Sequence, residues 1–173
     1  MAASFYDLSA ASFLQTVGAM AGFLDRAAQH YAGSPDLDYL VSERLFFDMA
    51  PLHFHVEAAC HHSRYGMEAV RTGVFDPPGL RGKVPFADLQ AMARDTEAAL
   101  AGLRREEVDG WAGRDLDLQI GPRRLAFTSE SYILSFALPN FHFHVTTAYA
   151  ILRTNGVPIG KRDYEGTLRT RNT

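Results

Sequence analysis

The chain has 173 residues, of which 47% are hydrophobic and 21% are charged. These proportions are typical of one folded globular domain and exclude collagen-like and largely disordered proteins. The net charge of −3 provides no positive field that would attract nucleic acid, so we expect no nucleic-acid partner.

The N-terminal segment does not have the layout of a signal peptide. The first basic residue is Arg26, and Asp7 and Gln15 interrupt the apolar residues before it. No stretch reaches the ~18 consecutive apolar residues that a membrane-spanning helix needs. We therefore predict a cytoplasmic protein that does not bind a membrane.

Apolar residues recur every three or four positions in the first half of the chain, which is the pattern of amphipathic helices. One stripe covers residues 13–31, and a second covers residues 37–70. Pro51 lies inside the second stripe, where its ring and its missing N–H should kink a helix. We predict two helices, the second of them long and bent.

A third helix is expected over residues 85–103, because Pro85 suits a first helical position and one face is apolar. The charged connection that follows alternates between apolar and polar residues at 116–120 and 124–127, on either side of the turn signal Gly121-Pro122. This pattern predicts a small β-hairpin.

The last apolar stripe runs from Ser129 to Ile151, with Pro139 inside it and a helix stop at Asn155-Gly156. Amphipathic helices must bury their apolar faces against one another. We therefore predict an all-α four-helix bundle with a small β-hairpin between the third and fourth helices. It should form one domain over residues 1–166, followed by a flexible tail at 167–173.

Polar residues interrupt the apolar faces of the second and fourth helices. Steps of three and four place Asp48 and His55 on or beside the inward face of the second helix, and Asn140 and His144 on that of the fourth. A buried polar group without a partner costs ~1–3 kcal/mol. These side chains should therefore contact one another, water or a metal ion, for which imidazole is a common ligand.

The other candidate groups favour structural roles. His53 and His142 are each two positions from an inward histidine and should point away from it. His62 follows His55 by seven residues and could face the same groove, although we expect it on the surface. Cys60, the single cysteine, lies on an apolar stripe with no activating cation, so we expect an inert buried thiol.

The fourth helix has a sequence specific enough to suggest a family. The run from Phe136 to Arg153, FALPNFHFHVTTAYAILR, resembles a bacterial family of unknown function within the DinB/YfiT-like superfamily. The segments that begin at Tyr6 and Asp48 look similar to the same family, and the likeness extends to about Gly166. It implies a bundle of four long helices, often dimeric, in a superfamily of divalent-metal enzymes that includes thiol-dependent S-transferases and a mycothiol-dependent isomerase.

The resemblance also implies a metal site. The superfamily's triad is one histidine on the second helix and a His-x-x-x-His pair on the last helix, and these positions match His55 and His144. The second position of the pair is Ala148, which cannot bind a metal. Asp48 and Asn140 could supply oxygen ligands instead, in a looser site than three histidines would make.

Two interpretations remain open. In the first, a groove between the second and fourth helices holds a divalent metal ion (zinc, nickel, manganese or iron) and a small-molecule substrate, with thiol-dependent transferase chemistry as one option. In the second, no metal binds, and the polar residues form a core network in a non-catalytic binding or interaction protein. A homodimer fits either interpretation, and the sequence assigns no catalytic residue. The expected metal ligands are His55, His144, Asp48 and Asn140, and the expected substrate-binding residues are Phe47, Phe136, Phe141 and Tyr149.

Overall fold

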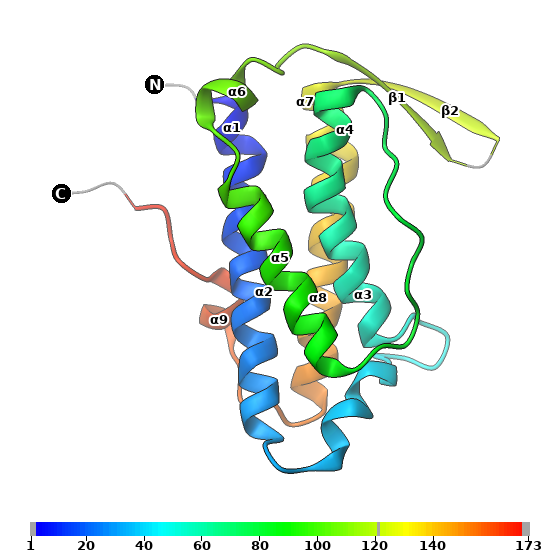
Figure 1. Ribbon diagram of the computed structural model, residues 1–173, viewed down its shortest axis with the longest axis vertical. Coiled ribbons are helices and arrows are strands. Elements are labelled where there is room, and N and C mark those ends of the chain that lie inside the picture. The colour runs from blue at the N-terminus through cyan, green and yellow to red at the C-terminus, as the bar shows by residue number, and fades with distance from the viewer. Residues whose placement is uncertain (1–2, 121, 171–173) are drawn as a thin grey trace.

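Four helical columns form a bundle in the computed structural model, which describes residues 3–120 and 122–170 (Figure 1). Each column packs against two neighbours, so that α2, α5, α3 and α8 follow one another around the bundle. The chain runs in one direction through α2 and α8 and in the opposite direction through α3, α4 and α5 (Figure 1). The predicted all-α bundle is confirmed. The columns are α2 (Ala10–His30); α3 (Leu52–Cys60), η3 (His61–Tyr65) and α4 (Gly66–Thr72); α5 (Phe86–Ala101); and α7 (Ser129–Tyr132), η4 (Ile133–Ala137) and α8 (Leu138–Thr154).

The bundle encloses one continuous hydrophobic core. Large side chains such as Phe13, Leu52, Leu89 and Phe141 are fully buried and come from all four columns. Burial of a side chain of this size contributes ~1.5–3 kcal/mol, so the core is the main source of stability. Among the helices of the described residues, none combines the length and the hydropathy that a bilayer crossing requires.

The predicted second helix is shorter than the sequence pattern indicated. Residues 35–42 form two 3-10 turns, η1 (Pro35–Asp38) and η2 (Leu40–Ser42), and the helix begins only at Leu52. Pro51 occupies the N-cap position, where the missing N–H of proline costs nothing. The proline therefore starts the helix instead of bending it, and residues 43–51 form a loop that is closed by a bridge between Arg44 and Pro51.

Two π-helical segments, η3 and η4, interrupt neighbouring columns, and η3 contacts the last column at α8. A Cβ placed on Gly66, directly after η3, would lie 3.6 Å from the hydroxyl of Tyr132 and 3.8 Å from the Cβ of Ala137. Pro139 follows η4 by two residues and cannot donate a backbone hydrogen bond. π-Helical turns inside α-helices are frequent at functional sites, and both segments lie beside the histidines described below.

The predicted hairpin is confirmed in β1 (Asp115–Ile120) and β2 (Arg123–Thr128), with Leu118 opposite Leu125. Gly121 of the predicted turn lies outside the described residues. The connection before the hairpin is more structured than its charge predicts. It contains α6 (Arg105–Asp109), and it buries Val108 and Trp111 against the end of the bundle.

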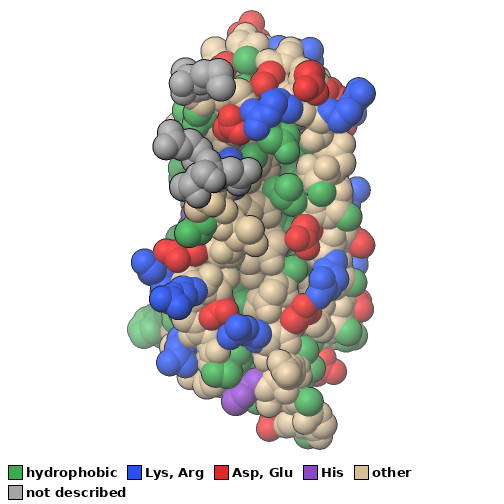
Figure 2. All heavy atoms as spheres, turned by 90° about the vertical axis from the view of Figure 1, so that its left-hand side faces the viewer, with side chains coloured by type: hydrophobic (Ala, Val, Ile, Leu, Met, Phe, Trp, Pro, Cys, Tyr) green, Lys and Arg blue, Asp and Glu red, His purple; other side chains and the backbone are tan. Residues whose placement is uncertain are grey.

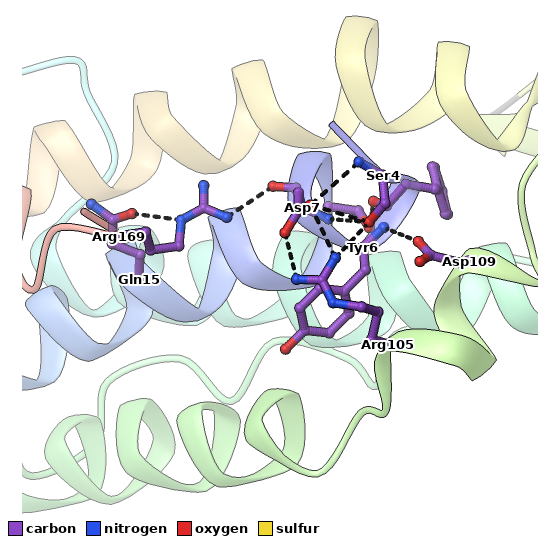
Figure 3. A network of polar contacts seen from close by, with 9 residues as sticks. Ser4, Tyr6, Asp7, Gln15, Arg105, Asp109 and Arg169 are labelled. Atoms are coloured by element: carbon purple, nitrogen blue, oxygen red, sulfur yellow. Dashed lines mark hydrogen bonds and ion pairs between the residues drawn. The ribbon is translucent and has the colours of Figure 1, made fainter. Parts of the chain in front are cut away.

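A polar network ties three distant segments together at the N-terminal end of α2 (Figure 3). Ser4 and Asp7 form a capping box on the short helix α1 (Phe5–Leu8). Arg105 of α6 binds the Asp7 carboxylate through two nitrogens, at 2.8 and 3.0 Å, and holds the pKa of Asp7 well below its usual range. Arg169 donates to the backbone carbonyl of Asp7 and to the side chain of Gln15.

The chain after α8 returns along α2. It forms α9 (Lys161–Glu165), which packs on α2, and the Glu165 carbonyl accepts a hydrogen bond from Gln15. Within the segment predicted as a flexible tail, Arg169 is attached to α2, while residues 171–173 lie outside the described residues. A groove of about 780 Å³ runs over this face of α2. Figure 2 shows charged side chains of both signs around it.

Candidate functional site

Two histidines from neighbouring columns meet inside the bundle. Nδ1 of His55 on α3 lies 2.9 Å from Nδ1 of His144 on α8, and the two ring centroids are 5.2 Å apart. His55 is 2% exposed, and His144 is half-buried. The helical spacing predicted that these rings face inward, and the structure confirms that they do.

A backbone carbonyl fixes the proton positions of this pair. Nε2 of His55 lies 3.1 Å from the oxygen of Ala50. A carbonyl oxygen only accepts, so this nitrogen must carry the hydrogen. Nδ1 of neutral His55 is then the acceptor, and His144 must donate through its own Nδ1. Nε2 of neutral His144 is left with a lone pair, for which the described residues provide no hydrogen-bond partner.

Aromatic rings surround the two imidazoles. Phe54 and Phe143, each directly before a histidine in the sequence, lie 5.7 and 5.4 Å from the ring of His144. His62 of η3 stacks on His144 with centroids 5.7 Å apart and planes 12° apart. Phe75 also stacks on His62, with centroids 5.9 Å apart and planes 14° apart. The surroundings of the pair are therefore mostly apolar.

This environment keeps the imidazoles neutral at physiological pH. Burial lowers the pKa of His144 to about 4, with further lowering from the nearby His55 and His62. Burial also lowers the pKa of His62 to about 4 and that of His55, although the Ala50 carbonyl opposes the shift of His55. A neutral imidazole keeps a lone pair that can accept a proton or bind a metal ion.

Two of the predicted site residues lie on the loop before α3. Asp48 is exposed, and Phe47 is 80% exposed. The placement of Asp48 on an inward helical face was wrong, because the helix begins at Leu52 and residue 48 is not helical. The helical phase of the second stripe therefore does not apply to either residue.

The other predicted residues lie on the last column but face different neighbours. Phe136 contacts the ring of His62 at 5.7 Å and so lies near the pair. Asn140 donates from Nδ2 to the Phe136 carbonyl at 2.8 Å, within its own column. Phe141 packs on Phe13 of α2 at 5.0 Å, and Tyr149 packs on Phe23 of α2. These last two rings face α2, whereas His144 faces α3.

Sequence reasoning missed three side chains and one backbone carbonyl of this site. His62 was expected on the surface, but it is half-buried and stacked on His144. Its seven-residue spacing from His55 was the available signal. Phe54 and Phe143 could have been found from the Phe-His pair that occurs in both helices. The role of the Ala50 carbonyl depends on the fold of the loop, and no side-chain pattern indicates it.

The two Nδ1 atoms are close to the spacing that two imidazole ligands of one metal ion have. Two ligands at ~2.0–2.1 Å in a tetrahedral site are about 3.3 Å apart, so the separation of the two Nδ1 atoms would have to grow by only a few tenths of an ångström. Hydrogen bonding of the opposite ring nitrogen to a backbone carbonyl, as in His55, is the usual support of a metal-bound histidine. Among the described residues, no group of three or more His, Cys, Asp or Glu side chains is placed to hold a metal.

Comparisons with known proteins agree with this architecture. Residues 5–165 match the model of a family described as a domain of unknown function, DUF1993. Among solved structures, the chain is similar to a DinB family member protein from Shewanella denitrificans, with 26% sequence identity and a TM-score of 0.79. That match covers 97% of this chain and 95% of the other chain. No curated protein matches the sequence. The chain therefore belongs to the DUF1993 family and has a DinB-like fold.

Proposed function

We propose that this protein is a small-molecule enzyme whose chemical centre is the pair His55 and His144, holding one divalent metal ion. The observation that supports the proposal is the convergence of the two Nδ1 atoms, 2.9 Å apart, between α3 and α8. Of the four ions considered, zinc, nickel and iron suit imidazole ligands, whereas manganese prefers oxygen ligands. The resemblance to the DinB/YfiT-like superfamily, which implies metal-binding histidines at the positions of His55 and His144, also supports it, and the chain has a DinB-like fold.

Each residue of the site has a definable role in this proposal. His55 and His144 would hold the ion, and the Ala50 carbonyl would keep His55 oriented through Nε2. His144 would carry its proton on Nε2 instead of Nδ1. The rings of Phe54 and Phe143 lie against His144 and would give an apolar part of the substrate a surface to pack on. A bound ion of this kind lowers the pKa of a thiol or water, which is the chemistry of a thiol-dependent transferase.

A second candidate function follows from the same distance. A separation of 2.9 Å is also that of an ordinary N–H···N hydrogen bond, and Ala148 occupies the position where the superfamily pattern has a further ligand. In this alternative, the pair is a metal-free polar contact that fixes the register of α3 against α8 in a binding or interaction protein. Neither Asp48 nor Asn140 takes part in the contact between the two rings.

Metal content and thermal melting distinguish the two candidates. The protein should be purified without a histidine tag, analysed for metals and melted with added zinc or manganese and with a chelator. We expect a melting temperature that rises with metal and falls with chelator, because an ion that binds only the folded state stabilises it. The His144→Ala variant should lose this response.

The matched control is His142→Ala, which removes an imidazole two positions away on the same helix. His142 contacts the Tyr164 hydroxyl at 3.2 Å, away from His55. This variant should keep the metal response of the unchanged protein. Indifference of the unchanged protein to both metal and chelator would overturn the metal proposal and favour the register contact.

A further inference from the structure

A separate cavity of about 300 Å³ lies between the column α3–η3 and helix α5. The connection between α4 and α5 closes it with Pro78, Gly79 and Arg81. Neither His55 nor His144 lines this cavity, so it is distinct from the site described above. Its volume is at the lower end of the range for small-molecule pockets, ~300–1,000 Å³, which limits a ligand to a few heavy atoms.

The inner wall of the cavity carries a buried carboxylate. Glu57 is 3% exposed, and both of its oxygens accept the same backbone N–H, that of Arg81, at 2.8 and 3.0 Å. An ionised carboxylate has about four acceptor positions, so a single shared N–H leaves most of them without a donor. Burial of a charge is costly unless it is paired. A cationic ligand would supply the missing donors.

Two further buried polar side chains line the cavity, Cys60 on α3 beside Glu57 and Thr96 on α5 across from it. Cys60 and Thr96 are 3% and 2% exposed, and both line the cavity with Glu57. A hydroxyl oxygen is an acceptor and a thiol sulfur is a weak one. A primary ammonium group has three donors, as the lysine side chain does, and the two sides of the cavity together provide a carboxylate, a hydroxyl and a sulfur for them. Burial raises the pKa of the Cys60 thiol to about 12, so the thiol stays protonated and makes no covalent bond.

The mouth of the cavity carries charges of both signs. Arg64 and Arg81 are exposed there, and the guanidinium of Arg64 lies over the ring of Tyr65 at 5.6 Å. Asp88 and Asp95 of α5 line the opposite side. The buried charge of the cavity is therefore negative, and its guanidinium groups lie at the rim. A ligand that enters with its ammonium group first would leave an anionic end near the arginines.

We propose that this cavity binds a small primary amine with an anionic end, of the size of a short amino acid. The ammonium group pairs with the Glu57 carboxylate and contacts Thr96, and the carboxylate of the ligand faces Arg64 and Arg81. This arrangement compensates the buried charge of Glu57 and uses both signs of charge in the cavity. The site binds its ligand without a chemical step.

Titration calorimetry with 4-aminobutyrate tests the proposal, with n-butylamine and butyrate as ligands that each carry one of the two charges. We expect saturable binding of 4-aminobutyrate in roughly the millimolar range, weaker binding of n-butylamine and no binding of butyrate. Glu57→Gln keeps an acceptor for the Arg81 N–H but removes the charge. It should weaken binding at least ~tenfold, because hydrogen bonds to charged groups are the stronger ones.

Two other variants separate loss of the site from loss of the fold. Ala91 is exposed at the rim of the cavity, so Ala91→Trp should block entry without touching Glu57. Glu106→Gln makes the same chemical change on α6, outside the cavity, and should bind as the unchanged protein does. No heat of binding from either amine up to roughly 50 mM would overturn the proposal. Binding that survives both Glu57→Gln and Ala91→Trp would do the same.

Discussion

His62 connects the chemistry of the site to the stability of the protein. Its ring stacks on both Phe75 and His144, and its buried Nδ1 has no hydrogen-bond partner in the described structure. A buried polar atom without a partner costs ~1–3 kcal/mol. His62 therefore lowers the stability of the folded protein by an amount that a nonpolar ring of similar shape would not.

We predict that His62→Phe reduces the loss of stability in acid. Because the pKa of His62 is about 4 in the folded state and near 6.5 when exposed, the unfolded state takes up the proton first. The free energy of unfolding therefore falls as the pH drops from about 6.5 to 4 and is fully restored above this window. Between these pH values, the free energy of unfolding of the variant should fall by about 1–2 kcal/mol less than that of the unchanged protein. This figure is smaller than the full pKa shift implies, because solvent screens part of the shift at a half-buried ring.

Urea unfolding at several pH values from about 8 to 4 measures this difference. His144 has a similar pKa, of about 4, so the variant should keep part of the acid dependence. Equal pH dependence in the two proteins would show that His62 takes up its proton equally well in both states.

At the residue scale, the sequence predicted the inward position of the two central histidines but did not predict which other side chains lie next to them. Steps of three and four reveal an inward side chain, so His55 and His144 were identified. The same steps cannot tell which neighbouring helix an inward side chain faces. Phe141 and Tyr149 were therefore assigned to the groove, although they pack on α2. The placement of Asp48 was wrong because the helical spacing around His55 was continued through Pro51, where the helix in fact begins.

At the scale of elements, Gly166 determines how closely the C-terminal segment approaches α2. Its φ of +63° is in the region that favours glycine. A Cβ at this position would lie 3.0 Å from the Cβ of Ala19 and 3.1 Å from the carbonyl oxygen of Gln15. Both the backbone conformation and the contact with α2 therefore require the absence of a side chain.

We predict that Gly166→Ala detaches the segment after α9 from α2. The substitution combines backbone strain of ~1–3 kcal/mol with a steric clash, and loss of the contact relieves both. Trypsin should then cleave after Arg169 faster than in the unchanged protein. Gly33→Ala is the matched control, because Gly33 has φ +80° with no atom close to its added Cβ. Equal cleavage rates in Gly166→Ala and Gly33→Ala would contradict a specific contact with α2.

The elements themselves were predictable to different degrees. The stripes of residues 13–31 and 85–103 and the alternation of the hairpin are local patterns, and the corresponding elements formed. Pro51 was ambiguous, because a proline can kink a helix or begin one. The segments η3 and η4 contain ordinary helix-compatible residues, so their π-helical form depends on contacts between the columns. The short helix α9 has too few residues for a periodic pattern.

At the scale of the whole molecule, Trp111 follows α6, which lies at the end of the bundle away from the start of α3 (Figure 1). It is the single tryptophan, it is 4% exposed, and its carbonyl accepts a hydrogen bond from Ser129 at 2.8 Å. The hydrogen bond connects the end of α6 to the start of the last column. The hairpin end is therefore joined to the core.

We predict that tryptophan fluorescence and far-ultraviolet circular dichroism report the same unfolding transition in urea. A single hydrophobic core should unfold cooperatively, as small single domains usually do. The midpoints and slopes of the two curves should coincide within error. A fluorescence transition at a clearly lower urea concentration would show that the hairpin end unfolds separately, against one domain over residues 1–166.

The acceptor that orients His55 belongs to the main chain at Ala50. Replacement of one side chain by another at that position leaves the carbonyl in place, so an alanine scan would overlook the atom that determines which nitrogen of the imidazole is protonated. What can change it is the number of residues between Arg44 and Pro51, since these two residues close the loop. An insertion or deletion in this loop, more than a point substitution at Ala50, would therefore move the carbonyl and change the basicity of the pair.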